Sequence, residues 1–260
     1  MGETYTKFKE LGAEFDLGDG YLEHLTNYDV VFRTPGMYFN NPALTAARKQ
    51  GVIITSEMET FFDLCPCRIY GVTGSDGKTT TTTLISEMLA KTGRRVYKGG
   101  NIGKALLPLI ETIREEDAAV VELSSFQLIS MRRSPDVAVI TNISPNHLDV
   151  HGTMEEYIGC KVNLIAHQNA YSKTVLNLDN AQTAALAEQV RGRLLWFTRQ
   201  QKPERGTFLD AEGWLCYAEA GKTQRIVRAE DIRIPGLHNV ENYMAAILAV
   251  EGLASDDDIR

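Results

Sequence analysis

The chain has 260 residues, of which 43% are hydrophobic and 23% are charged, as in an ordinary globular protein of one large or two smaller domains. The formal net charge of −7 argues against a general nucleic-acid-binding surface. No apolar stretch approaches the ~20 residues of a membrane span, and the first residues lack the regions of a signal peptide. We therefore expect a cytoplasmic protein that binds neither nucleic acid nor membrane.

The four cysteines, Cys65, Cys67, Cys160 and Cys216, are expected to be reduced. Cys65 and Cys67 are separated by one residue rather than two, and no second pair accompanies them. The spacing therefore does not predict a zinc site.

The first part of the chain has the pattern of an incomplete α/β unit. It predicts a buried strand at 28–32, a helix at 42–50, a strand at 51–55, a helix at 57–63 and a linker at 64–67. A Rossmann-like unit would begin with a strand and a glycine turn, and residues 1–27 contain no such pair.

From residue 68 onward, strands and helices alternate. Strands are predicted at 68–72, 94–98, 117–123, 136–141, 173–178 and 193–198, with helices at 78–91, 104–115, 154–168 and 180–190. This alternation predicts an α/β fold with a doubly wound, mainly parallel sheet. A small antiparallel set follows at 207–209, 214–217 and 225–227, and a helix at 238–253 ends the pattern.

A glycine-rich loop joins the strand at 68–72 to the helix at 78–91. It reads Thr73-Gly74-Ser75-Asp76-Gly77-Lys78-Thr79-Thr80. Glycines let the backbone approach an anion closely, and the free N–H groups and the helix N-terminus then face phosphate oxygens. In this context Lys78 would neutralise the terminal phosphates and the Thr79 hydroxyl would hold Mg²⁺.

The spacing of this loop departs from the usual phosphate-binding pattern. The glycine expected five residues before Gly77 is replaced by Val72. The alternative is a glycine-rich turn without a ligand, but a Lys-Thr pair at a strand-to-helix junction favours the phosphate-binding interpretation.

Polar side chains follow two further strands. Glu122 lies at the end of the strand at 117–123, where carboxyl ends of parallel strands line a ligand crevice, so it is placed to meet Mg²⁺. The alternative is a solvated glutamate. The strand at 136–141 is followed by Asn142, His147 and Asp149. His147 is a candidate metal ligand, but spacing alone does not choose between it and His151.

Three weaker candidates remain. Periodicity predicts that Lys161 is a solvated surface lysine. The loop at 99–103 suits a second close backbone approach to a ligand. Asn239 is a candidate N-cap of the last helix, and Asn242 lies on the same side one turn later. Two carboxamides can hydrogen-bond a purine edge.

Four segments, taken in this order, resemble the Mur ligase family of ATP-dependent amide-forming enzymes. They are the loop at 73–80, Glu122 to Leu128, Asn142 to Lys161, and Gly236 to Asn242. A fifth, Thr34-Pro35-Gly36, resembles the loop of the first domain that approaches the substrate diphosphate. The resemblance extends from about residue 28 to the end of the chain.

The resemblance implies a reaction and its small-molecule partners. The segment from Glu122 to Leu128 is similar to that of the ligases that add D-glutamate to UDP-N-acetylmuramoyl-L-alanine, through an acyl phosphate made from ATP, in peptidoglycan precursor synthesis. We expect a monomer. The alternatives are another Mur or folylpolyglutamate-type ligase, a generic P-loop ATPase and a catalytically silent ATP-binding domain.

The resemblance also implies residue roles. The ATP-binding residues would be Gly74, Ser75, Asp76, Gly77, Lys78, Thr79 and Thr80, with Asn239 and Asn242 near adenine. Thr79 and Glu122 would hold a first Mg²⁺ and His147 a second. Lys161 would be carbamylated and so become an anionic metal ligand, which reverses the interpretation from periodicity. Lys78, His147 and Lys161 would be catalytic, and Thr34, Gly36, Asn101 and Ser124 would bind substrate.

The chain also departs from the family pattern. Asp76 stands where many relatives carry Asn, and the uridine-binding start is not recognisable in residues 1–27. We expect residues 1–67 to be part of a UDP-substrate-binding domain and residues 68–260 to be the central ATP-binding domain, without the C-terminal ligase domain. Such a fragment is expected to bind ATP without completing the reaction.

Overall fold

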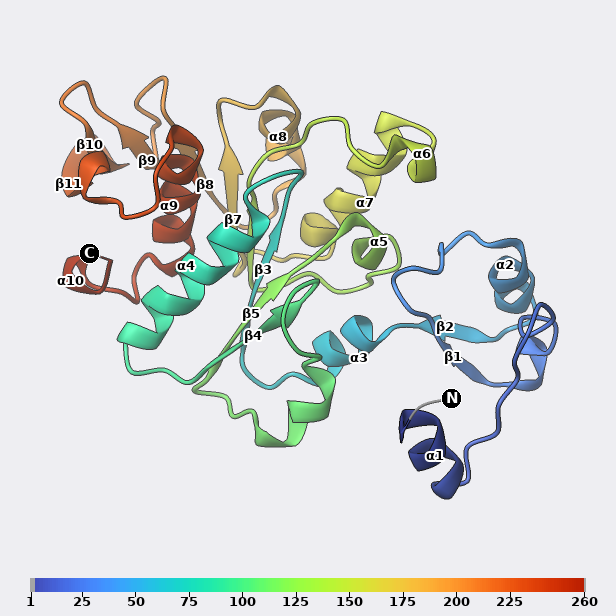
Figure 1. The fold of residues 1–260 in the computed structure, drawn as a ribbon. Helices are drawn as coiled ribbons and strands as arrows, with labels where there is room; N and C mark the ends of the chain where they lie inside the picture. The colour runs from blue at the N-terminus through green and yellow to red at the C-terminus, as the bar shows by residue number, and fades with distance from the viewer. Residues whose placement is uncertain (1–2, 260) are drawn as a thin grey trace. The chain divides into compact units, whose positions relative to one another are not determined.

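The computed structural model describes residues 3–259, and the chain divides into two compact units, one ending at Ser56 and one beginning at Glu57 (Figure 1). The first unit contains α1 (Glu3–Glu10), a 3-10 turn (Leu25–Asn27), β1 (Val30–Phe32), α2 (Pro42–Lys49) and β2 (Ile53–Thr55). The strands β1 and β2 pair in parallel. This confirms the helix and both strands that the sequence predicts here.

A small core holds the first unit together. Helix α2 begins after Asn41, whose side chain accepts a hydrogen bond from the Ala43 N–H at 2.9 Å. Leu44 and Ala47 on this helix pack with Val52 and Ile54. Together they occupy one side of the two-stranded sheet.

The strand predicted at 28–32 is present as β1, but the prediction that it is buried is wrong. Val30 and Phe32 are 44% and 58% exposed, whereas Val31 packs against the small core. Successive side chains of a strand point to opposite faces, and the core of this unit covers only the face that Val31 shares.

The second unit is built on a nine-stranded sheet in the order β11-β10-β9-β8-β7-β6-β3-β5-β4. Its strands are β3 (Arg68–Thr73), β4 (Val96–Gly100), β5 (Ala118–Glu122), β6 (Val137–Ile140), β7 (Lys173–Asn177), β8 (Arg193–Thr198), β9 (Gly206–Leu209), β10 (Trp214–Glu219) and β11 (Lys222–Arg228). Neighbouring strands from β9 through β8, β7, β6, β3 and β5 to β4 pair in parallel. Strand β10 pairs antiparallel with both β9 and β11. The fold class predicted from the sequence is therefore confirmed. The small antiparallel set extends the main sheet, since β9 pairs with β8.

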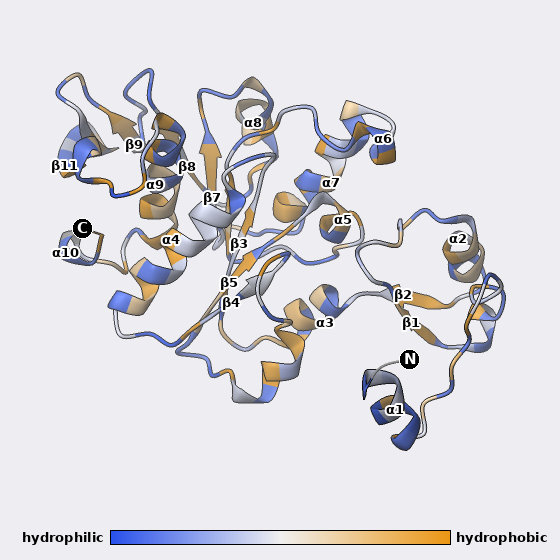
Figure 2. Ribbon diagram, viewed as in Figure 1, coloured by the Kyte–Doolittle hydropathy of each residue, from blue (hydrophilic) through white to orange (hydrophobic). Residues whose placement is uncertain are grey.

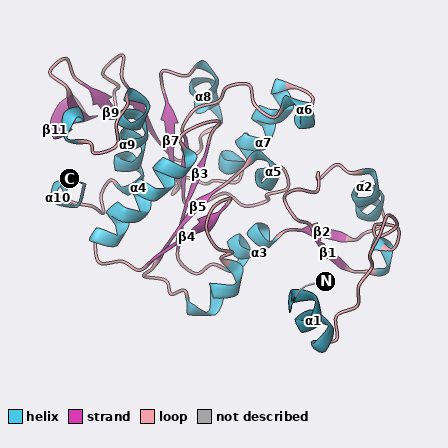
Figure 3. Ribbon diagram, in the orientation of Figure 1, coloured by secondary structure: helices cyan, strands magenta, loops and turns pink. Residues whose placement is uncertain are grey.

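Helices cover both faces of this sheet (Figures 1 and 3). On one face, α4 (Lys78–Lys91) and α9 (Leu237–Val250) pack on one hydrophobic cluster. On the other, α3 (Glu57–Leu64) and α7 (Met154–Ala166) pack on a second. The shorter helical elements are a 3-10 helix (Leu107–Thr112), α5 (Ser125–Leu128), α6 (Leu148–His151), α8 (Ala181–Ala184), 3-10 turns at Ala185–Gln189 and Ala229–Asp231, and α10 (Asp256–Ile259).

The central strands supply both clusters because they are buried on both faces. Val137 and Val139 belong to the first cluster, whereas Ala138 and Ile140 belong to the second. Figure 2 shows this as hydrophobic colouring along strands such as β7. Continuous apolar strands of this kind are typical of parallel sheets.

Two elements differ from the predicted ones. The helix expected at 104–115 is only a 3-10 helix at Leu107–Thr112. Pro108 lacks a donor and disfavours the α conformation of the residue before it. The helix expected at 180–190 is split into α8 and a 3-10 turn.

No helix in the described part of the chain is long and apolar enough to cross a membrane.

Helix α3 lies in the second compact unit, so the boundary falls before Glu57 rather than before Arg68. Met58, Phe61 and Phe62 are buried in the second cluster. The Glu57 carboxylate accepts hydrogen bonds from the backbone N–H groups of Leu106 and Leu107 at 3.0 and 2.8 Å. Helix α3 thus packs in the second hydrophobic cluster and is hydrogen-bonded to the start of the 3-10 helix at Leu107–Thr112.

We predict that Phe61→Ala destabilises the second unit by about 3–5 kcal/mol, because it empties a fully buried aromatic site. Both tryptophans, Trp196 and Trp214, lie in that unit, so denaturant unfolding followed by tryptophan fluorescence reports on it. The control is Leu64→Ala on the same helix, whose side chain is 56% exposed. Equal shifts for both variants would contradict the packing of α3 on this unit.

Candidate functional site

The loop between β3 and α4 is held against the end of β6. Gly77 has a φ of 78°, the left-handed conformation that glycine adopts readily. A Cβ atom on Gly74 would collide with Thr141 Oγ1, and one on Gly77 would collide with Asn242 Oδ1. Both glycines are therefore needed for a close approach of the backbone.

Hydrogen bonds fix the conformation of the loop. The Thr141 hydroxyl donates to the Asp76 carbonyl at 2.6 Å, and Ser75 N–H donates to the Asn142 carbonyl at 2.8 Å. The Asn142 side chain accepts from Asp76 N–H at 3.0 Å. Lys78, the first residue of α4, donates from Nζ to the Ser75 carbonyl at 2.9 Å. The lysine thus folds back over the loop, as a phosphate-neutralising lysine would.

Glu122 is brought to this loop by strand pairing. It ends β5, opposite Val72 of β3 and Gly100 of β4, and is 2% exposed. Its carboxylate accepts hydrogen bonds from Thr79 Oγ1 at 2.7 Å and from Asn101 Nδ2 at 3.0 Å. The alternative of a solvated glutamate is therefore wrong.

The surroundings of Glu122 fit a divalent cation. Among the described residues, no ion pair neutralises this buried carboxylate, and a hydroxyl and a carboxylate oxygen are ligands that Mg²⁺ prefers. No group of three or more His, Cys, Asp or Glu side chains in the described chain is placed to hold a metal by itself. A cation here would therefore need Thr79 and oxygen atoms from substrate or solvent in addition to Glu122.

Lys161 is buried, so the interpretation of this residue as a surface lysine is wrong. It is 1% exposed, donates from Nζ to the Gly74 carbonyl at 2.8 Å and lies 4.6 Å from the centre of the Tyr157 ring. Tyr157, Cys160 and Leu164 share its buried side of α7. That spacing is the apolar stripe of an amphipathic helix, and it was the signal that could have located Lys161.

Burial also changes the protonation of Lys161. Desolvation, and secondly the positive charge of Lys78, lower the pKa of Lys161 from 10.5 to about 7. Half of the amine is then neutral near pH 7 and nucleophilic.

The structure separates the two competing histidines. His147 is exposed and lines a cavity with Lys78 and Lys161, and its φ of 53° is unusual for a residue with a side chain. His151 is 1% exposed, and its Nε2 lies 2.9 Å from Ser125 Oγ. The Phe126 ring lies between them, with centroids 5.3 Å and 5.1 Å from the two imidazoles. Of these two histidines, His147 is the one that lines the cavity, and its role as a metal ligand stays a prediction.

The cavity at this end of the sheet measures about 260 Å³. It is lined by Gly74, Lys78, Asn101, Ser124, Ser125, Phe126, Asn146, His147, Tyr157 and Lys161. Sequence reasoning did not name Ser125, Phe126, Asn146 and Tyr157 as site residues, although Ser125 and Phe126 lie in a segment that resembles the family. Tyr157 contacts Ser75, with its hydroxyl 3.1 Å from Ser75 Oγ, and nothing in a single tyrosine on a helix marks it as part of a site.

Ser124 has a structural role as well as a place on the cavity wall. It forms a capping box at the start of α5, in which its backbone N–H donates to Gln127 Oε1 at 3.0 Å and its hydroxyl accepts from Gln127 N–H at 3.3 Å. Loss of Ser124 would therefore affect α5 together with the cavity.

Asn239 and Asn242 connect α9 to the loop side of α4. Asn242 accepts from Thr81 Oγ1 at 3.2 Å and donates to Asn239 Oδ1 at 3.1 Å, and Asn239 donates to the Pro235 carbonyl at 2.7 Å. The N-cap position is Gly236, so the expectation that Asn239 caps this helix is wrong. Contact with adenine stays a prediction.

Thr34 and Gly36 lie in the first unit, in a turn. Met37 N–H donates to the Thr34 carbonyl at 3.1 Å, and Arg33 Nη1 donates to the Met37 carbonyl at 2.8 Å. Both Thr34 and Gly36 are exposed. Their contact with a substrate diphosphate stays a prediction.

The protein-family model of the Mur ligase middle domain matches residues 72–250 of the chain. The chain belongs to the Mur ligase family. The family resemblance inferred from the sequence is thereby confirmed, and the loop, Glu122, Lys161 and the Asn239–Asn242 pair all lie in the matched region.

Relatives within the Mur ligase family carry a more specific name. The chain is 48% identical over its whole length to UDP-N-acetylmuramoylalanine–D-glutamate ligase of Acetivibrio thermocellus, covering 56% of that protein. It is 44% identical over 98% of its length to the enzyme of that name from Clostridium novyi, covering 55% of it. The chain thus spans little more than half the length of these relatives.

Solved structures of Mur ligases share the fold. A UDP-N-acetylmuramoyl-L-alanyl-D-glutamate–2,6-diaminopimelate ligase matches 84% of the chain with a TM-score of 0.61 at 20% identity, over 55% of that structure. MurF ligase from Thermotoga maritima, in complex with ADP, matches 78% with a TM-score of 0.55 at 23% identity, over 50% of that structure. At this identity the match concerns the arrangement of the sheet and helices.

We predict that Lys161→Met stabilises the protein at pH 6, and that this advantage falls as the pH rises. With a folded-state pKa near 7 and an unfolded value of 10.5, the unfolded state binds more protons between these pH values. Wild-type stability therefore rises relative to the variant by up to about 1.4 kcal/mol per pH unit above pH 7. Denaturant unfolding of both proteins at pH 6, 7 and 9, in CO₂-free buffer, measures the difference. A constant difference would show that Lys161 keeps an ordinary pKa.

Proposed function

We propose that the chain is the ATP-binding part of a ligase that adds D-glutamate to UDP-N-acetylmuramoyl-L-alanine in peptidoglycan precursor synthesis. The substrate assignment is supported by relatives of that name at 43–48% identity. The observation that carries the chemistry is the contact of Glu122 with Thr79 and Asn101 beside the Lys78 loop. We further propose that the enzyme acts as a cytoplasmic monomer, with residues before the ATP-binding domain contributing to the UDP-substrate site through Thr34 and Gly36.

The oxygen of a carboxylate is a poor leaving group, so an amine cannot displace it until the carboxylate is activated. A carboxylate is activated as an acyl phosphate by transfer of the terminal phosphoryl group of ATP, and the amine of D-glutamate then displaces phosphate to form the amide. Both steps bring anionic groups together, so the enzyme must supply positive charge and alignment rather than a nucleophile. Two Mg²⁺ ions would supply much of that charge when bound.

The described side chains divide this work. The loop from Gly74 to Thr80 would hold the phosphates, with Lys78 moving from the Ser75 carbonyl to a phosphate oxygen. Thr79 and Glu122 would hold a first cation, and His147 a second. Asn101 and Ser124, which lie on the same cavity wall, would orient the substrate. Asn239 and Asn242 would approach adenine from α9.

Carbamylation of Lys161 would convert the buried cation into an anion. The ammonium first loses one proton, and the neutral amine then adds CO₂ and loses a second proton. The charge thereby changes from +1 to −1, and two hard oxygen ligands are gained. A pKa near 7 makes the neutral amine available for this addition. Burial penalises every charged form of Lys161, but the positive charge of Lys78, which also lowers the pKa of the ammonium, would favour a carbamate anion.

We predict that Lys78→Ala weakens ATP binding by roughly tenfold to a hundredfold, because a charge-assisted contact to phosphate is lost. The matched control is Lys91→Ala, at the opposite end of α4. Calorimetric titration with Mg²⁺-ATP measures both. Near-normal affinity of the Lys78 variant for ATP would contradict the proposal that this loop binds the phosphates.

The ligase assignment is tested with a protein that contains this chain and has the full length of its relatives. We expect amide formation with UDP-N-acetylmuramoyl-L-alanine, ATP and D-glutamate, and a loss of at least about a hundredfold in Lys161→Ala, with partial recovery on addition of a short carboxylate. D-glutamate should be replaced poorly by L-glutamate. Preference for a different amino acid would favour another Mur or folylpolyglutamate-type ligase, and ATP binding without any ligation would favour a silent nucleotide-binding protein.

A further inference from the structure

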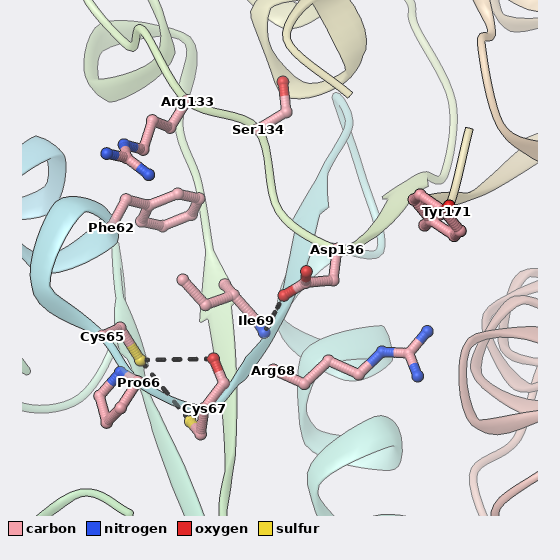
Figure 4. Close-up of a pocket in the computed structure, with 10 residues that line it drawn as sticks. All are labelled: Phe62, Cys65, Pro66, Cys67, Arg68, Ile69, Arg133, Ser134, Asp136 and Tyr171. Atoms are coloured by element: carbon pink, nitrogen blue, oxygen red, sulfur yellow. Dashed lines mark hydrogen bonds between the residues drawn. The ribbon is translucent and has the colours of Figure 1, made fainter. Parts of the chain in front are cut away.

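A second cavity, of about 530 Å³, lies at the opposite edge of the large sheet from the loop of residues 73–80. Its wall includes Cys65, Cys67, Arg68, Arg133 and Asp136 (Figure 4). Arg68 begins β3 and Asp136 immediately precedes β6, so this cavity is at the amino ends of strands whose carboxyl ends form the candidate active site. None of the residues assigned to ATP or substrate lines it.

Two thiols face each other on this wall. The Sγ atoms of Cys65 and Cys67 are 3.6 Å apart, and both cysteines are free. Two residues of extended chain span at most ~7 Å, close to the upper limit for a disulfide between their Cα atoms. Pro66 fixes one backbone dihedral between them and so limits the conformations of this connection.

The two thiols differ in access and reactivity. Cys65 is partly exposed, whereas Cys67 is 5% exposed and packs in the hydrophobic cluster beneath α3. A hydrogen bond from the Cys67 thiol lowers the pKa of Cys65, against the opposing effects of burial and of Asp136. The same hydrogen bond, together with burial, raises the pKa of Cys67. Cys65 is thus the attacking sulfur and Cys67 the resolving one.

We propose that Cys65 and Cys67 form a reversible dithiol–disulfide pair that is oxidised by a low-molecular-weight disulfide entering this cavity. The Cys65 thiolate attacks one sulfur of that disulfide, and the other sulfur leaves as a thiolate. Cys67, after losing its proton, then attacks Cys65 Sγ and displaces the second thiolate. The protein dithiol loses two electrons and two protons, and the small disulfide becomes two thiols.

The cavity fits an anionic disulfide. Two guanidinium groups, those of Arg68 and Arg133, lie on the wall together with the carboxylate of Asp136, which accepts a hydrogen bond from Ile69 N–H at 2.8 Å. Arg133 pairs with Asp63, so Arg68, which has no ion pair among the described residues, is the cation left to meet an anionic ligand. A disulfide that carries carboxylates, such as oxidised glutathione, combines the required sulfur chemistry with this charge.

The test is a redox titration of the whole chain with mixtures of reduced and oxidised glutathione, followed by alkylation and peptide mass spectrometry. We expect one peptide in which Cys65 and Cys67 are joined with the loss of two hydrogens, reversed by a dithiol reductant. Cys160 and Cys216, both buried, should react only after denaturation. A dithiol that remains reduced at every ratio would overturn the proposal.

Single substitutions assign the order of attack. Cys65→Ser should prevent modification of Cys67, and Cys67→Ser should leave a mixed disulfide on Cys65. Cys216→Ser, in β10, is the control and should titrate like the wild type. Oxidation of Cys67 at an unchanged rate in Cys65→Ser would overturn the assignment of Cys65 as the attacking sulfur. Because Cys67 is in the core, circular dichroism should establish that its variant is folded, and the wild-type titration decides the proposal in either case.

Discussion

The contact between the glycine loop and the end of β6 is the constraint on which the rest of the site depends. Gly74 lies so close to Thr141 that no side chain fits between them, and Thr141 and Asn142 hold the Asp76 peptide on both sides. This contact exists because β3 and β6 are parallel neighbours whose carboxyl ends coincide. Pairing of β3 with β5 brings Glu122 to the same edge. A change in the register of either pair would separate the loop from its carboxylate.

The buried charges around this loop oppose stability and favour function. Glu122 and Lys161 are both almost fully buried, yet neither is paired with an opposite charge among the described residues. Glu122 receives hydrogen bonds only from neutral groups, and Lys161 is bonded to carbonyl and hydroxyl oxygens of Gly74 and Thr73. Desolvation of unpaired charges is costly, so such an arrangement is expected where a ligand supplies the missing charge.

The two edges of the large sheet offer different chemistry. The carboxyl edge gathers oxygen ligands and lysines around a backbone loop, as nucleotide-binding α/β proteins do. The amino edge carries the Cys65–Cys67 pair, in the connection between α3 and β3. Strand β3 joins them, beginning next to Cys67 and ending at Thr73, so both edges share one buried strand.

The sequence by itself determined the strands of the second unit, its long helices at 78–91, 154–166 and 237–250, the glycine-rich loop at 73–80 and the placement of Glu122 at a strand end. These features follow from local patterns: apolar runs, glycine positions and the rule that parallel strands end at one edge. The family resemblance determined the family and pointed to Lys161. Spacing did not distinguish His147 from His151, and the resemblance pointed to His147. The tertiary structure shows the physical difference between them, because their burial depends on packing against Phe126 and Ser125. It also decided that β9 to β11 extend the main sheet, that α3 packs with the second unit, and that Val30 and Phe32 are exposed. Each of these depends on contacts between residues distant in the chain, which periodicity does not encode.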